Sequence, residues 1–145
     1  MDELLEASVI NRVVRSNATT SSFQHPLVYY ALVHEVAALT DFGRLPASPW
    51  LMERRARIGQ ILHAGAYHAI ISKRTDLLAE ILLCSHMLAA PVIGQLRAGV
   101  DFLVTSQHTD GTWGEQTTVR SNRVRHAVLT ATAVLIAYKI AAPVQ

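Results

Sequence analysis

The first residues that could do chemistry are a tyrosine, a histidine and an aspartate in one apolar stretch. Tyr30, His34 and Asp41 are separated by four and seven residues, so a single face of a helix would carry all three. Histidine titrates near neutral pH and can exchange protons with a substrate. The stripe predicts either acid/base catalysis at the mouth of a cavity, or a histidine that bonds a neighbour beside a core tyrosine.

A second pair of candidates, Asp76 and Glu80, lies one helical turn apart in another apolar stretch. Asp76 falls in a first turn, where a carboxylate stabilises the positive end of the helix dipole. Glu80 stands among leucines, and burying an unpaired carboxylate there costs on the order of several kcal/mol. We therefore expect Glu80 either to bond a histidine or arginine, or to face a cavity. His34, Asp41 and Glu80 are the candidate catalytic residues.

Four residues are candidates for lining a substrate pocket. Tyr30 belongs to the stripe described above, and His63 and Tyr67 lie one turn apart on a predicted helix. His126 begins the last apolar stretch of the chain. The sequence holds seven histidines, and we interpret most of them as structural.

The elements that must position these residues are helices joined by short loops. Apolar residues recur at helical spacing, and Pro26, Pro49 and Pro91 stand where helices begin. No stretch alternates as a strand would. The pattern predicts one all-α domain over residues 1–145, with a flexible polar linker at 16–25. Six helices are expected, at residues 2–15, 26–42, 49–72, 75–90, 91–106 and 122–142.

The predicted helix at 75–90 carries almost no polar face. Helices of this kind are normally covered on all sides. We therefore expect either that this helix is central in the fold, or that a second chain covers it.

The most specific motif lies at the end of the fifth predicted helix. Residues 97–114 read RAGVDFLVTSQHTDGTWG. Gln107 can bond free backbone groups of the next helix, and its amide can stack on the flat face of Trp113. Gly111 permits a positive φ in the tight loop between them. We predict that Gln107, Gly111 and Trp113 form a structural clamp between helices.

This stretch resembles the QW motif of triterpene cyclases and the related repeats of protein prenyltransferases. The resemblance implies an α/α toroid, in which antiparallel helix pairs form two concentric rings around a cavity. Six helices would make half of such a ring, which a second copy or another protein would close. His34 with the run at 41–43, together with the run at 76–80, is also similar to short cyclase-like actinobacterial proteins of natural-product pathways.

The catalytic signatures of these families are missing from the sequence. Neither the Asp-x-Asp-Asp acid of class II terpene cyclases nor an aspartate-rich magnesium motif occurs. Protein prenyltransferases bind zinc through Asp, Cys and His, but here Cys84 and His86 lie about 200° apart around a regular helix. We therefore predict no metal and no cofactor.

Composition narrows the class of protein further. Half of the chain is hydrophobic, 17% is charged and the mean hydropathy is +0.24. The longest charge-free apolar run, 127–138, is shorter than the ~18 residues that a membrane-spanning helix needs. The acidic first residues do not resemble a signal peptide. We therefore predict a cytoplasmic domain with no membrane span and with more apolar surface than a monomer hides.

The charge balance and the cysteine content exclude two further classes. The chain has 13 basic and 11 acidic residues, and it carries no zinc-finger spacing and no glycine-rich phosphate loop. No nucleic-acid partner is therefore expected. Its one cysteine, Cys84, excludes an internal disulfide and fits a reducing compartment.

Three classes of function stay open. The first is a metal-independent cyclase or isomerase of secondary-metabolite biosynthesis, or a subunit of one, with an apolar pocket and acid/base side chains. The second is a non-catalytic subunit that binds and stabilises another biosynthetic enzyme. The third is a carrier or sensor of an apolar small molecule. We expect a homodimer or a heteromeric partner from the same pathway.

Overall fold

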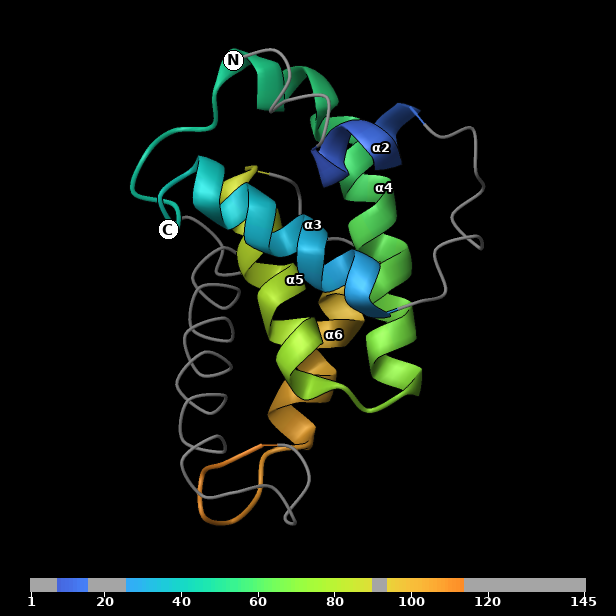
Figure 1. The fold of residues 1–145 in the computed structure, drawn as a ribbon. Coiled ribbons are helices and arrows are strands. Elements are labelled where there is room, and N and C mark those ends of the chain that lie inside the picture. The colour runs from blue at the N-terminus through green and yellow to red at the C-terminus, as the bar shows by residue number, and fades with distance from the viewer. Residues whose placement is uncertain (1–7, 16–25, 90–93, 114–145) are drawn as a thin grey trace.

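The computed structural model describes residues 8–15, 26–89 and 94–113, which form five α-helices and contain no strand. The all-α class predicted from the sequence is confirmed for these residues. The predicted helix at 122–142, the linker at 16–25 and the pocket candidate His126 lie outside the described residues. The helices are α2 (Val9–Arg15), α3 (Pro26–Leu39), α4 (Pro49–Ile71), α5 (Thr75–Met87) and α6 (Gln95–Thr105) (Figure 1).

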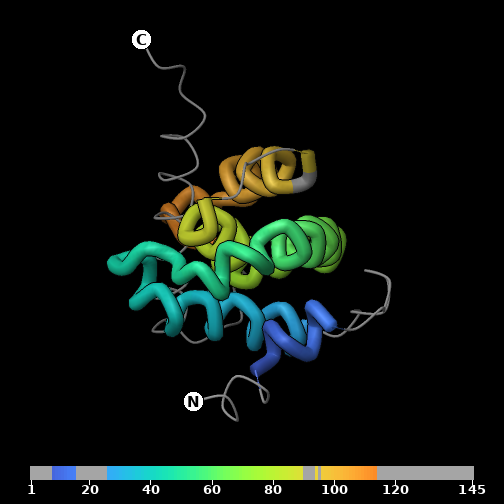
Figure 2. The backbone as a smooth tube through the Cα atoms, turned by 90° about the horizontal axis from the view of Figure 1, so that it is seen from above, coloured from blue at the N-terminus to red at the C-terminus, as the bar shows by residue number. Residues whose placement is uncertain are grey.

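The described helices pack in three layers. Figure 2 shows α2 and α3 on one side, α4 and α5 in the middle, and α6 on the other side. A tight turn at residues 72–74 joins α4 to α5, which run antiparallel (Figure 1). The helix α5 contacts α3, α4 and α6, and α4 contacts these layers too, so α4 and α5 together form the centre of this arrangement.

The central position of α5 explains its apolar sequence. Leu77, Leu78, Ala79 and Ile81 are completely buried, and α3, α4 and α6 are the helices that α5 contacts. Burial of a leucine or isoleucine side chain contributes about 1.5–3 kcal/mol. Of the two arrangements that the sequence allowed for this helix, the described part of the chain has the central one.

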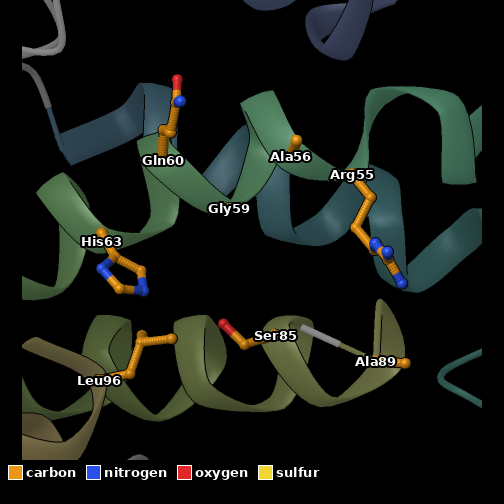
Figure 3. A pocket seen from close by; sticks show the side chains of 8 residues that line it. All are labelled: Arg55, Ala56, Gly59, Gln60, His63, Ser85, Ala89 and Leu96. Atoms are coloured by element: carbon orange, nitrogen blue, oxygen red, sulfur yellow. The ribbon is translucent and has the colours of Figure 1, made fainter. Parts of the chain in front are cut away.

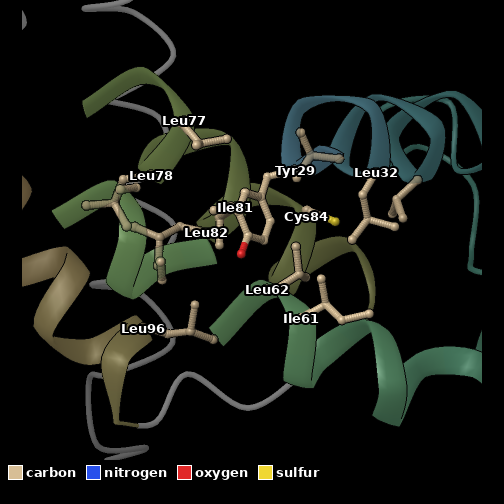
Figure 4. Packing of buried hydrophobic residues seen from close by; sticks show 14 of the residues in the cluster. Tyr29, Leu32, Ile61, Leu62, Leu77, Leu78, Ile81, Leu82, Cys84 and Leu96 are labelled. Atoms are coloured by element: carbon tan, nitrogen blue, oxygen red, sulfur yellow. The ribbon is translucent and has the colours of Figure 1, made fainter. Parts of the chain in front are cut away.

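Two glycines allow the layers to approach closely. A Cβ at Gly65 of α4 would lie 2.7 Å from Cδ1 of Tyr29, and a Cβ at Gly99 of α6 would lie 2.9 Å from Cδ1 of Leu78. Both distances are far shorter than van der Waals contact. Figure 4 shows the ring of Tyr29 beside Ile81 in this packed core.

The beginning of α4 follows the sequence prediction. Ser48 caps the helix, because its Oγ accepts a hydrogen bond from the backbone N–H of Leu51 at 3.3 Å. Pro49 occupies the first helical position, where a missing N–H costs nothing.

The end of α3 corrects a prediction. The helix ends at Leu39, three residues before the predicted end at Phe42. Asp41, Phe42 and Gly43 have φ values of +46°, +55° and +81°, which no right-handed helix contains. The N–H of Phe42 donates to the carbonyl oxygen of Ala37 at 2.7 Å, so the chain closes the helix in a left-handed turn.

Two other helix boundaries also differ from the prediction. The helix α5 ends at Met87 and α6 begins at Gln95, so both are shorter than the predicted 75–90 and 91–106. Both predicted boundaries were drawn against Pro91, which lies outside the described residues. A helix usually ends before a proline, but the residue at which it ends depends on local hydrogen bonds.

The short helix α2 is attached to α3 by its first turn. Ser8 Oγ accepts from the N–H of Asn11, and Oε2 of Glu35 accepts from the N–H of Ile10 at 2.9 Å. These two side chains satisfy backbone donors that a helix leaves free at its start. Glu35 therefore acts in fold stability and not at the candidate site. In the part of the chain that the structure describes, no helix is both long enough and apolar enough to span a membrane.

Candidate functional site

Four side chains that could exchange protons lie together between α3 and α5. Tyr30 and His34 come from α3, and Asp76 and Glu80 come from α5. Nε2 of His34 lies 3.3 Å from Oε2 of Glu80, and the hydroxyl of Tyr30 donates a hydrogen bond to Oδ2 of Asp76. We call these four residues the α3–α5 cluster.

Equal spacing on the two helices produces this cluster. Tyr30 and His34 are four residues apart, and so are Asp76 and Glu80. Residues four apart lie one above the other on one face of a helix. The ring centroids of Tyr30 and His34 are 6.3 Å apart. Two adjacent helical turns on α3 therefore meet two adjacent turns on α5.

The surroundings of Tyr30 keep its hydroxyl protonated. Burial is the main cause that raises the pKa of Tyr30 above its usual value, and the hydrogen bond and negative charge of Asp76 raise it further. The charge of Glu80 acts in the same direction, while Arg74 opposes it. Tyr30 is therefore a hydrogen-bond donor at neutral pH and not a base.

His34 and Glu80 differ strongly in their exposure. The side chain of His34 is 66% exposed, whereas that of Glu80 is 20% exposed. A largely buried carboxylate thus contacts one nitrogen of an imidazole that solvent reaches. The sequence predicts that Glu80 either bonds a histidine or arginine or faces a cavity. In the structure its Oε2 lies within ion-pair distance of His34 without a hydrogen bond to it, and the side chain also lines a cavity.

The cavity beside this pair is small and otherwise apolar. It has a volume of about 130 Å³, and we call it the α3–α5 pocket. Burial raises the pKa of the Cys84 thiol, so this lining residue stays protonated and is not a nucleophile. The lining residues are His34 and Glu80 together with Val33, Ala37, Phe42, Leu83, Cys84 and Met87.

Asp41 does not join the pair, which corrects the predicted stripe. The helix ends at Leu39, so the helical register that would place Asp41 below His34 is lost. Asp41 is half exposed, and its Oδ2 lies 3.4 Å from Nε of Arg44 in the turn that follows α3. It is also not one of the described residues that line the α3–α5 pocket. The carboxylates that contact this stripe come from α5 instead, with Asp76 at Tyr30 and Glu80 at His34.

The other pocket candidates lie elsewhere. His63 lines a larger hollow of about 510 Å³ between α4, α5 and α6, which we call the α4–α6 groove (Figure 3). Tyr67 is 58% exposed and lines neither the groove nor the α3–α5 pocket. The structure therefore separates Tyr30 from His63, which sequence reasoning had grouped in one pocket.

The motif after α6 forms a compact loop. Nε1 of Trp113 donates to the carbonyl oxygen of Leu103 at 2.6 Å, and the Trp113 side chain is buried. Nε2 of Gln107 donates to the carbonyl oxygen of Gly111, which has a φ of +80°. The bond of Gln107 thus lies within its own loop. The three residues hold the loop against the end of α6, which is a structural role.

Sequence reasoning missed the partner of Tyr30. From the sequence, we interpret Asp76 as a partner of the α5 dipole. Asp76 and Glu80 are four residues apart, as Tyr30 and His34 are, and equal spacing is what two facing pairs on neighbouring helices require. This matched spacing was the available signal.

The described residues include no group of three or more His, Cys, Asp or Glu side chains that could hold a metal ion.

Comparison with protein-family models shows a match over most of the chain. A family model described as "Domain of unknown function (DUF6895)" matches residues 3–135. No curated protein and no solved structure matches the chain.

Proposed function

We propose that this chain, which belongs to the DUF6895 family, transfers protons on a small, largely apolar molecule bound in the α3–α5 pocket. The observation that carries this proposal is the contact of 3.3 Å between Nε2 of His34 and Oε2 of Glu80. A carboxylate beside an imidazole can select one tautomer of the ring, and a histidine held in this way can act as a general base.

The proposed reaction is an isomerisation by proton transfer. The ring nitrogen of His34 that does not face Glu80 removes a proton from a carbon of the substrate. The same imidazolium returns the proton to another carbon, so that a double bond moves and no other reagent is consumed. Glu80 stabilises the charge on the ring between the two steps, and the apolar lining holds the substrate.

The size of the pocket limits what can bind in it. A volume of about 130 Å³ lies below the roughly 300–1,000 Å³ of typical ligand sites. The reacting part of the substrate is therefore a small apolar group, which is either a whole molecule or the end of a longer one. A place in natural-product biosynthesis, which the sequence resemblance implies, is part of this proposal.

Hydrogen exchange in deuterated water tests the proposed function. The full chain is incubated with a panel of small β,γ-unsaturated ketones, and incorporation of deuterium and conjugation of the double bond are followed by NMR. We expect His34→Gln and Glu80→Gln each to lower the rate by about 10²-fold or more. His108→Gln is the matched control, because His108 lies in the loop after α6, and its rate should equal that of the unmodified chain.

A null result has a defined meaning in this experiment. If no ketone exchanges faster with the unmodified chain than with the His34→Gln variant, His34 is not a general base for such carbon acids. Equal rates for the unmodified chain and Glu80→Gln would instead remove Glu80 from the mechanism.

One observation favours a second candidate function, which is binding to another protein. The turn after α3 places Phe42 at 74% exposure and Leu45 at 57% exposure beside the pocket. Exposed apolar side chains that gather in one place often mark an interface. We propose as the alternative that this turn docks on a partner enzyme of the same pathway.

The alternative predicts a different result from the enzyme proposal. Replacing Phe42 and Leu45 together by serine should abolish association in sedimentation experiments with the products of adjacent genes. Phe42 also lines the α3–α5 pocket, so the activity control is Leu45→Ser alone. This single variant should weaken the association and keep the rate of ketone hydrogen exchange within about twofold. Association that persists in this double variant would exclude the turn as the interface.

A further inference from the structure

The α4–α6 groove lies on the other face of α5 and is independent of the function proposed above. Ser85, which lines it, lies about 140° around α5 from Glu80, and Ala89 lines it from the turn after α5. Its volume of about 510 Å³ falls within the range of small-molecule sites. The groove is therefore large enough for a ligand that the α3–α5 pocket could not hold.

Small residues on α4 create the hollow. A Cβ built on Gly59 would have no atom within 4 Å, and Ala56 stands one turn before it. Ala89 and Leu96 supply the apolar wall on the opposite side. The body of a bound molecule would therefore lie against aliphatic carbon.

The ionisable side chains that line the groove in the described residues are basic. Arg55 and His63 extend from α4 toward α5, one at each end of the groove (Figure 3). They are eight residues apart, about 12 Å along the helix axis. Arg55 makes no hydrogen bond or ion pair with a described residue. The described residues that line the groove include no acidic side chain.

Two further polar residues of the groove are already engaged. Oγ of Ser85 is fully buried and donates to the carbonyl oxygen of Ile81 at 2.9 Å. Oε1 of Gln60 accepts from Nη1 of Arg57 at 3.2 Å, which orients the amide. The charge available to a ligand is thus the guanidinium of Arg55, a group that prefers carboxylates and other planar anions.

From this chemistry we propose that the α4–α6 groove binds an amphipathic carboxylate. Its anionic head pairs with Arg55, and its aliphatic body lies over Gly59 between Ala56 and Leu96. His63 stands at the far end, where its ring covers the tail or donates to a second polar group. The ligand class is a monocarboxylic acid with an aliphatic chain.

Calorimetric titration of the full chain with octanoate tests the proposal. Three compounds are titrated in parallel. Octylamine has the same chain with a positive charge, octan-1-ol has the chain with an uncharged head, and acetate has the carboxylate without the chain. We expect octanoate to bind at least about tenfold more tightly than any of the three. In NMR spectra recorded with octanoate, the backbone amide signals that shift should be those of residues 55–63, 85–89 and 96.

Two variants and one control locate the site. Arg55→Gln should weaken octanoate binding by about tenfold, because it removes a charge-assisted hydrogen bond. Gly59→Leu should abolish binding, because the new side chain enters the open space that the ligand occupies, and circular dichroism shows whether the fold is kept. Arg97→Gln removes an exposed charge from α6 without touching the groove lining, and it should change the affinity by less than about twofold.

Several results would overturn the proposal. Equal binding of octanoate and octylamine would remove the role of Arg55, and equal binding of octanoate and acetate would remove the apolar body. Unchanged octanoate binding in a folded Gly59→Leu variant would place the ligand elsewhere. Should Gly59→Leu not fold, unchanged binding in Arg55→Gln would overturn it alone.

Discussion

The two faces of α5 carry hollows of opposite design. On the face toward α3, two acidic side chains meet a histidine and a tyrosine, and the His34–Glu80 pair of this cluster lines a pocket of about 130 Å³. On the face toward α4 and α6, one unpaired arginine stands beside a groove of about 510 Å³ with no acidic lining residue among those described. The first hollow is small, and its two charged or titratable polar groups, His34 and Glu80, lie against each other. The second is large and leaves its charge for a ligand.

This difference shows how one apolar helix separates two environments. The buried side chains of α5, which are apolar except for Thr75 and Ser85, form the wall between the hollows. Solvent reaches His34 on one face and Arg55 on the other, and it screens Coulomb interactions between charged groups on the two faces. The chemistry of each hollow can therefore be changed while the other stays intact.

The largest expected effect comes from α4, where two glycines face these environments differently. Gly65→Ala places a Cβ 2.7 Å from the Tyr29 ring and 3.0 Å from Cδ1 of Ile81, and we expect it to lower the free energy of unfolding by about 1–3 kcal/mol. Gly59→Ala places a Cβ in open space and should raise it by about 1 kcal/mol, because alanine favours the helix. Urea unfolding of both variants measures the difference.

Equal stability of the two alanine variants would contradict this prediction. It would mean that Tyr29 moves aside without cost, and that the wall between the hollows is not tightly packed. A loss of stability in Gly59→Ala would show that the α4–α6 groove is closed in solution.

The sequence predicted the helices better than it predicted their ends. The helical spacing of apolar residues located each described helix, and the apolar character of α5 indicated its central place. The end of α3 was misjudged, because Asp41 and Phe42 adopt left-handed φ values that L-residues seldom adopt and that spacing does not reveal. The half-ring arrangement implied by the motif after α6 stays a prediction.

The sequence predicted which residues belong to the candidate site but not which of them are partners. His34, Glu80 and Tyr30 were selected from their residue types and their apolar surroundings. Their partners depend on which faces of α3 and α5 meet, and that is decided by packing across the whole core. The groove was missed because a hollow made by Ala56 and Gly59 is a lack of side-chain volume, which has no motif.

A smaller effect is expected at high pH, and it distinguishes the two faces again. The pKa of Tyr30 is raised in the folded protein, so the folded state holds this proton more tightly than the unfolded state does. The stabilisation is complete below about pH 10, the ordinary tyrosine value, and is lost as the pH rises above it. We therefore expect the free energy of unfolding to fall above pH 10.

Two tyrosine variants assign this loss to the α3 face. Tyr30→Phe should lower stability at pH 7 by about 1–2 kcal/mol, because Asp76 loses a hydrogen bond, and should make the decline above pH 10 shallower. Tyr67→Phe, at a residue that is 58% exposed, should change neither quantity by more than about 0.5 kcal/mol. Identical pH profiles for Tyr30→Phe and the unmodified chain would assign the alkaline loss to other groups, among them Tyr29 and Cys84.

The smallest effect concerns the rim of the α3–α5 pocket. Phe42 has a φ of +55° and an exposed side chain, so its backbone is strained while its ring buries little surface. Glycine adopts this conformation without a steric penalty, whereas alanine retains the strain. We expect Phe42→Gly to be more stable than Phe42→Ala by about 1 kcal/mol in thermal unfolding, even though glycine is the more flexible residue when unfolded. The opposite order would mean that the turn rearranges in solution, and the rim would then be an adaptable edge in contrast to the rigid wall that α5 provides.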